Sequence, residues 1–247
     1  ILQNAKALVQ ISTNIINVAC FFCQHSAIFG HAASSHTVTI FLSFKSLFVS
    51  LKNFEVGAFS VATVMTGSIG ATHLAAHQIA LNLASISYMV ASGIGSASMI
   101  SLSYYHGKRN IVDMRKSGYA SFLLVLFLML ISALTFILLR DSLPKLYVDD
   151  ISVINIASSL LIIAGLFQIP DGIQAVGLGI LRGIRDIRKP TIVTFISYWI
   201  ISIPLSYLLG IKYGYGIYGI WVGLSIGLTL AAIFHVTRFN YLTFVKK

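Results

Sequence analysis

The amino-acid sequence predicts an all-α membrane protein that crosses the bilayer several times. Hydrophobic residues make up 57% of the 247 residues and charged residues only 10%, a composition far from that of a soluble domain. Several apolar stretches reach the roughly 20 residues that a helix needs to cross a bilayer core of about 30 Å. Basic residues lie mainly between these stretches, which is typical of membrane proteins.

Apolar stretches between charged loops define the predicted helices. We expect them near residues 50–67, 73–104, 118–139, 152–181, 191–211 and 216–237, all within one unit that covers residues 51–247. Residues 1–50 form a separate and poorly defined hydrophobic segment, in which Lys45 and three histidines follow no regular spacing. These histidines are His25, His31 and His36.

Clusters of basic residues predict the orientation of the helices. One cluster lies in the loop 105–117, a second in the loop 182–190 (Arg182, Arg185, Arg188 and Lys189), and a third in the C-terminal tail. Basic loops remain in the cytoplasm, so we expect these two loops and the C-terminus there. The net charge of +10 then reflects topology, and nucleic-acid binding is rejected as a function.

The stretch 152–181 contains Ile169-Pro170-Asp171-Gly172, which in isolation is typical of a turn. A turn would leave residues 172–181 to cross alone, and ten residues of helix rise only about 15 Å. We therefore expect one long helix that bends at Pro170, because proline lacks an amide proton and crowds the preceding turn.

Two of the seven acidic residues, Glu55 and Asp171, lie within predicted helices rather than loops. A carboxylate at membrane depth costs at least about 2.5–3.5 kcal/mol, so it usually faces a cavity, a partner or an ion. Such a group can bind and release a proton or hold a cation. Both residues are candidate coupling sites. For Glu55, an ordinary ion pair with Lys52 at the membrane interface is the alternative.

Polar residues at helical spacing form a stripe on the stretch 73–104, namely Gln78, Asn82, Ser85, Ser92 and Ser96. The stripe predicts either a water-filled pathway or a polar helix contact, and Gln78 and Asn82 are the better candidates for cavity lining. Gln168 and Gln174, which flank Asp171, are further candidates.

Small residues repeat every four positions in three places and predict close helix packing without a role in substrate binding. They are Gly219, Gly223 and Gly227, Gly179 with Gly183, and Gly93 with Ala97.

Motifs for other functions are not found. Cys20 and Cys23 with His25 lack the second ligand pair of a zinc site, so we expect buried thiols and no structural metal. His73 and His77 lack the glutamate of a metalloprotease helix, since Leu74 follows His73. No nucleophile elbow, P-loop or dinucleotide fingerprint occurs, so we predict neither an enzyme nor an ATP-driven pump, and no cofactor.

Three segments resemble the C-terminal half of multidrug and toxic compound extrusion (MATE) transporters of the NorM-like branch. They are Phe54–Ser60 (FEVGAFS), Met65–Ala80 (MTGSIGATHLAAHQIA) and Gln168–Pro190 (QIPDGIQAVGLGILRGIRDIRKP), and Tyr198-Trp199 with Pro204 fits as well. The resemblance covers about residues 53–242, whereas residues upstream of Asn53 depart from the family pattern.

The resemblance implies the six-helix C-terminal lobe of a twelve-helix transporter, whose missing N-terminal lobe completes a central cavity. Glu55 matches the acidic residue of the family's seventh helix and Asp171 that of its tenth, which implies roles in binding the coupling cation. The expected function is export of organic, often cationic, compounds in exchange for Na⁺ or H⁺. The expected location is the bacterial inner membrane, with small molecules and membrane lipid as partners.

Two alternatives remain open on the sequence. The chain could be a non-transporting half, either truncated or separately encoded, because it lacks an initial Met and the first lobe. It could also be a lipid-linked precursor flippase, although such a protein should show more charge in its cavity-lining helices than two carboxylates and no arginine.

Overall fold

The computed structural model describes residues 54–245, and the regular structure of this part is entirely helical. The predicted segment 1–50 and its cysteines lie outside the described residues. The chain forms the helix Phe54–Ile69, followed by α3 (Ala71–Gly107), α4 (Ile111–Leu138), α5 (Ile151–Gly183) and α8 (Gly216–Asn240). For this part of the chain the all-α prediction is confirmed.

Between α5 and α8 the chain forms one long span, Arg188–Lys212, with two π-helical segments. It consists of α6 (Arg188–Phe195), η2 (Ile196–Ser202), α7 (Ile203–Tyr207) and η3 (Leu208–Lys212). Pro204 lies at the start of α7 and has no amide hydrogen to donate to the carbonyl four residues back. Two short elements, η1 (Pro144–Leu146) and η4 (Tyr241–Val245), complete the described part.

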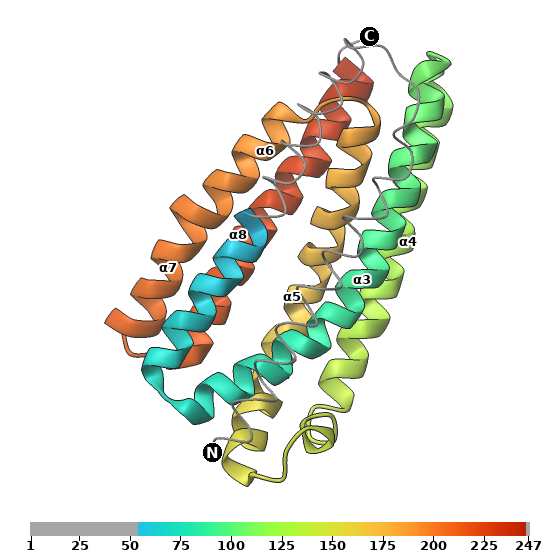
Figure 1. Cartoon of the computed structure of the whole chain (residues 1–247). Helices are drawn as coiled ribbons and strands as arrows, with labels where there is room; N and C mark the ends of the chain where they lie inside the picture. Colours follow the sequence, from blue (N-terminus) through green and yellow to red (C-terminus); the bar gives the residue numbers. More distant parts are fainter. Residues whose placement is uncertain (1–53, 246–247) are drawn as a thin grey trace, which may run out of the picture. The chain divides into compact units, whose positions relative to one another are not determined.

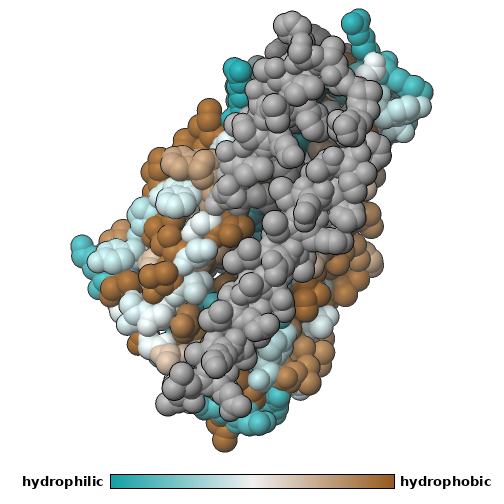
Figure 2. All heavy atoms as spheres, viewed as in Figure 1, coloured by the Kyte–Doolittle hydropathy of each residue, from teal (hydrophilic) through white to brown (hydrophobic). Residues whose placement is uncertain are grey.

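Five of the described helices are long and apolar enough to cross a membrane, and the helix Phe54–Ile69 is shorter. The five are Ala71–Gly107, Ile111–Leu138, Ile151–Gly183, Arg188–Lys212 and Gly216–Phe244. Figure 2 shows hydrophobic side chains along the sides of these helices and hydrophilic ones near their ends. Leu123, Leu124 and Phe127 of α4 are more than half exposed, as side chains that face lipid should be.

Helix α5 is the central element, and it contacts α3, α4 and α8 (Figure 1). The Asp150 side chain caps its first turn by accepting a hydrogen bond from the Ser152 amide at 2.9 Å. The helix continues through Pro170 to Gly183, which confirms the predicted single long helix.

Helix α4 begins at Ile111 rather than near residue 118. Asn110 explains the earlier start, because its side chain accepts a hydrogen bond from the Asp113 amide at 3.2 Å and donates one to the Asp113 carboxylate at 2.7 Å. Arg115 and Lys116 therefore lie on the first turns of α4 instead of in a loop. They remain at the same end of the helix, so the orientation that they predict is unchanged.

Glycines bring α3 and α5 into backbone contact. A Cβ atom on Gly179 would lie 2.2 Å from the carbonyl oxygen of Gly95, and one on Gly183 would lie 2.7 Å from that of Met99. Both residues of the predicted pair Gly93 and Ala97 are exposed, and nothing described lies within 4 Å of a Cβ on Gly93, so the described helices do not pack closely at this pair. The contact uses Gly95, on another face of α3.

Candidate functional site

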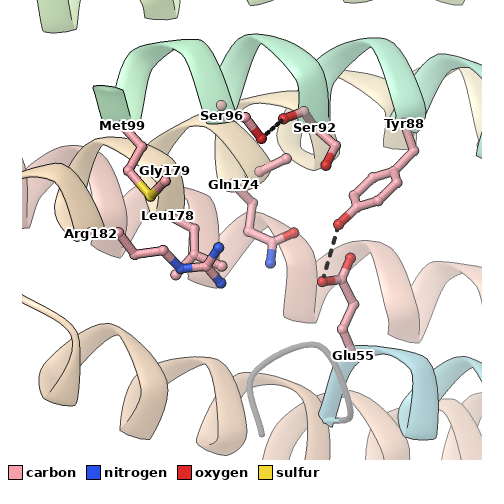
Figure 3. Close-up of a pocket in the computed structure, with 11 residues that line it drawn as sticks. Glu55, Tyr88, Ser92, Ser96, Met99, Gln174, Leu178, Gly179 and Arg182 are labelled. Atoms are coloured by element: carbon pink, nitrogen blue, oxygen red, sulfur yellow. Dashed lines mark hydrogen bonds between the residues drawn. The ribbon is translucent and has the colours of Figure 1, made fainter. Parts of the chain in front are cut away.

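The Glu55 side chain lies in the first turn of the helix Phe54–Ile69 and is only 7% exposed. The hydroxyl of Tyr88 on α3 donates a long hydrogen bond of 3.5 Å to its Oε2 atom (Figure 3). The indole Nε1 of Trp199 donates to the Phe54 carbonyl at 3.1 Å, and Gly57 leaves room for the same ring. Trp199 therefore holds the turn that carries Glu55.

Asp171 lies on α5 directly after Pro170 and is 3% exposed. Gly172 packs this turn against α4, since a Cβ there would lie 2.4 Å from Met129. The carboxylates of Asp171 and Glu55 both interact electrostatically with the hydroxyls of Tyr88 and Tyr198. The fold thus brings two acids that are more than 100 residues apart in sequence around the same two tyrosines.

A cavity of about 100 Å³ lies between the helix Phe54–Ile69, α3 and α5, which is room for a few water molecules. Figure 3 shows Glu55 on one side of it and the α5 side chains Gln174 and Arg182 on the other. The lining residues are Glu55, Tyr88, Ser92, Gly95, Ser96, Met99, Gln174, Ala175, Leu178, Gly179 and Arg182. Asp171 lies outside this lining, one helical turn before Gln174.

Gln174 connects the cavity to two neighbouring helices. Its Oε1 atom accepts a hydrogen bond from the Tyr198 hydroxyl at 3.2 Å, and its carbonyl lies 3.3 Å from Nδ1 of His235 on α8. The side chain is 1% exposed, yet its Nε2 atom has no hydrogen-bond partner among the described residues. A buried amide donor of this kind normally binds water or a ligand, so the cavity is a polar site rather than a packing defect.

The sequence predicts Arg182 in the loop 182–190, and this prediction is wrong. The structure places it in the last turn of α5, where its side chain lines the cavity. The expectation that no arginine lies in the cavity-lining helices is therefore wrong as well. In sequence, Arg182 resembles the basic residues Arg185 and Arg188 that follow it. In the structure, the rotation of α5 about its axis directs Arg182 into the cavity, whereas Arg185 and Arg188 lie beyond the end of α5 and are exposed.

The other candidate lining residues lie elsewhere. Asn82 accepts a hydrogen bond of 2.9 Å from the Tyr147 hydroxyl, and Gln78 is half-buried outside the cavity. Gln168 is fully buried, and neither polar atom of its side chain has a hydrogen-bond partner among the described residues. From the polar stripe on α3, Ser92 and Ser96 line the cavity.

His77 forms a buried network that is separate from the cavity. Trp221 Nε1 donates a hydrogen bond to His77 Nδ1 at 3.0 Å, and His77 Nε2 lies 3.1 Å from the hydroxyl of Thr63. That hydroxyl donates to the Phe59 carbonyl at 2.9 Å. An indole N–H can only donate, so His77 is neutral with its proton on Nε2. It joins α3 and α8 to the helix that carries Glu55.

The arrangement is suited to binding a small cation or a proton. Carboxylate, hydroxyl and amide oxygens are the ligands that hard cations prefer, and burial makes a carboxylate responsive to any positive charge that approaches. The described residues contain no group of three or more His, Cys, Asp or Glu side chains that could hold a metal ion.

Comparisons with known proteins place the chain in a family. The family model MatE matches residues 52–208, more than half of the chain. The probable multidrug resistance protein NorM of Xylella fastidiosa is 37% identical over 186 residues, which cover 75% of this chain and 40% of that protein. The multidrug resistance protein MdtK of Proteus mirabilis is 38% identical over 189 residues, 75% of this chain and 41% of that protein.

Solved structures agree on the fold. The eukaryotic MATE transporter AtDTX14 matches with a TM-score of 0.79 and 17% identity over 86% of this chain and 50% of that chain. A transporter of the MOP superfamily from Pyrococcus furiosus matches with a TM-score of 0.70. The chain spans about 40% of the length of the curated relatives described above. It belongs to the MATE family, a family of transporters rather than enzymes.

Proposed function

We propose that the transporter containing this lobe is a secondary active antiporter that exports organic, often cationic, compounds in exchange for Na⁺ or H⁺. The names of the relatives, multidrug resistance proteins NorM and MdtK, support export of drugs. An antiporter of this kind needs no cofactor, since the ion gradient supplies the energy. Its partners are small organic molecules, the membrane lipid and an N-terminal lobe.

The observation that carries the proposal is the buried carboxylate of Glu55, which faces a polar cavity between apolar helices together with Tyr88. A charged group in this position is costly unless a cation or a proton neutralises it. Asp171 interacts with the same tyrosines, so we propose that it shares the coupling role.

Cation binding would change the relative stability of the two states of the transporter. A ligand shifts such an equilibrium only by its difference in affinity between the states. A carboxylate that has bound a cation or a proton costs much less free energy to bury away from water than an empty, charged one. Each charge that moves down the membrane potential contributes about 2.3 kcal/mol per 100 mV. Substrate and coupling ion would then favour opposite states and compete.

We place the transporter in the bacterial inner membrane with the C-terminus in the cytoplasm. The support is the distribution of basic residues, because Lys108, Arg109, Arg185, Arg188 and Lys189 lie at the links that follow α3 and α5.

Of the two alternatives, the flippase is affected by the structure, because Arg182 adds a charge to the cavity. The absence of an arginine no longer counts against that function. The match to MatE over residues 52–208 favours drug export instead. A separately encoded half-transporter would be excluded by a homologous six-helix region in frame upstream of Ile1.

Dye export by the full-length transporter tests the proposal, with Na⁺ and pH gradients imposed separately on membrane vesicles. We expect Glu55→Gln and Asp171→Asn to lower gradient-driven export at least about tenfold. A neutral amide neither takes up a proton nor attracts a cation by its charge. Asp149→Asn, which removes an exposed acid in the link before α5, is the matched control and should export normally. Normal export by both test variants would show that these carboxylates are not the coupling site.

A further inference from the structure

Three ionisable side chains, two acidic and one basic, lie in or beside the cavity. Glu55 and Arg182 line it, and Asp171 lies one helical turn from the lining residue Gln174. With all three ionised, two negative charges and one positive charge leave the site with a net charge of minus one. One proton or one monovalent cation would therefore make the site neutral.

Arg182 and Glu55 approach the cavity from different helices. Figure 3 shows the guanidinium group of Arg182 and the amide of Gln174 extending from α5 into the space that the Glu55 carboxylate enters from the helix Phe54–Ile69. Arg182 interacts electrostatically with Glu55 and with Tyr88. Its fixed positive charge therefore lies in the field of the carboxylate that we propose as the coupling site.

We propose that Arg182 is a tethered counter-charge of Glu55, which competes with the coupling cation for this carboxylate and so sets the cation affinity of the transporter. This inference rests on the proposed function, because it assigns a role at the same carboxylate. It adds a specificity-determining residue on α5 and a stoichiometry of one monovalent cation or proton for the lobe.

The physical basis is the weak screening of charges in a cavity that excludes bulk water. A buried carboxylate needs a positive partner, and Arg182 supplies one that cannot diffuse away. Every cation that binds Glu55 must then do so against the repulsion of the guanidinium. The cation becomes easy to release, as a transport cycle requires, because Glu55 keeps a positive neighbour after release.

Other titratable groups around the site belong to several helices. They are Tyr88 on α3, Asp171 on α5, Tyr198 on η2 and His235 on α8. Arg182, unlike these groups, keeps a positive charge over the whole range of pH used for transport, so its removal changes the charge of the site by one unit at any such pH.

The experiment measures cation affinity in the full-length transporter. The half-maximal Na⁺ concentration for dye export and for thermal stabilisation is determined at fixed pH, and the midpoint pH of both is determined without Na⁺. For Arg182→Gln we expect a half-maximal Na⁺ concentration about tenfold lower, or a midpoint about one pH unit higher if protons couple. Arg182→Lys keeps the charge and should stay within about threefold of the parent.

Arg188→Gln is the matched control, since it removes an exposed arginine from the same end of the bundle, and it should leave the affinity unchanged. Unchanged affinity in Arg182→Gln, or an equal change in Arg188→Gln, would overturn the proposal. If Arg182→Gln does not fold, the double variant Glu55→Gln/Arg182→Gln should fold, because it no longer leaves a buried carboxylate without its counter-charge. A double variant that also fails to fold would refute the role of Arg182.

The outcomes separate this inference from the proposed function. If Glu55→Gln retains normal cation-dependent export, the coupling site is misassigned and both proposals fail. If Glu55→Gln abolishes cation dependence but Arg182→Gln leaves the cation affinity unchanged, the coupling site stands and only the counter-charge is refuted.

Discussion

Two helix contacts in this lobe are both built around glycines, but they differ in their polar groups. In the contact of α8 with η2, α7 and η3, Gly223 and Gly227 lie against Ser206 and Ser202, with positions for a Cβ only 2.4 and 2.5 Å from serine side-chain atoms. In the contact of α3 with α5, Gly179 lies against the backbone of Gly95. Both contacts bring helix backbones close together, as small residues at four-residue spacing allow.

The polar groups of the α8 contact satisfy one another. Ser202 donates to the Gly223 carbonyl at 3.1 Å, and Ser206 donates to the Ile220 carbonyl at 3.0 Å. Beside the α3–α5 contact, by contrast, the cavity is lined by the Glu55 carboxylate and the Arg182 guanidinium, and the Gln174 Nε2 atom there has no hydrogen-bond partner among the described residues. Spacing of small residues therefore indicates close packing, whereas polar groups that the neighbouring helices leave unsatisfied indicate function.

The largest effect is expected for Gly179→Ala, because its Cβ would meet a backbone oxygen that cannot move aside. We expect a loss of roughly 3 kcal/mol in the free energy of unfolding and a changed half-maximal cation concentration, since Gly179 also lines the cavity. Thermal unfolding and dye export of the full-length protein measure the two effects. Gly223→Ala should lower stability alone, and Gly93→Ala should change neither quantity. Equal cation affinities in Gly179→Ala and Gly223→Ala would contradict the distinction between the two contacts.

A smaller effect is expected for His77→Phe, because His77 joins α3 and α8 to the helix of Glu55. The change leaves the buried Trp221 N–H without an acceptor, which should cost about 2 kcal/mol of unfolding free energy. Thermal unfolding of His77→Phe, Trp221→Phe and the double variant measures the coupling between the two side chains. Strictly additive losses would show that the hydrogen bond contributes nothing.

The smallest effect concerns Asp150, at the end of α5 opposite Arg182. Hydrogen bonds from the Ser152 hydroxyl and amide lower the pKa of the Asp150 carboxyl below its ordinary value. A carboxyl whose pKa is lower in the folded state stabilises the fold above its unfolded pKa, and this contribution disappears as pH falls through the folded pKa. Asp150→Ala should therefore lower the unfolding temperature slightly at pH 7, and the difference from the parent should shrink below about pH 4.

Asp149→Ala is the control for Asp150, since Asp149 is exposed and does not cap the helix. Neither change should alter the cation affinity, because both residues lie far along α5 from the cavity. A loss in Asp150→Ala that persists undiminished at acid pH would show that the cap does not depend on the charge of the carboxylate.

Much of α5 and of its acid could be predicted from the sequence, because the reasons are local. The length of the apolar stretch required one helix through Pro170, and the cost of a buried carboxylate marked Asp171 and Glu55 as unusual. Arg182, Tyr88 and the contact at Gly95 could not be predicted. Their roles depend on which face of each helix meets a neighbour, and the apolar pattern of a membrane helix is too uniform to define a face.

The sequence by itself determined the class of protein and the apolar helices long enough to cross a membrane, and it identified two acids as candidate coupling sites. These properties follow from the free energy of transferring side chains into lipid, which acts on each residue separately. Only the tertiary structure decided that Glu55 shares a cavity with Tyr88, Gln174 and Arg182. Charges interact over distances in space, so the partners of a carboxylate become visible only when helices that are distant in sequence are packed together.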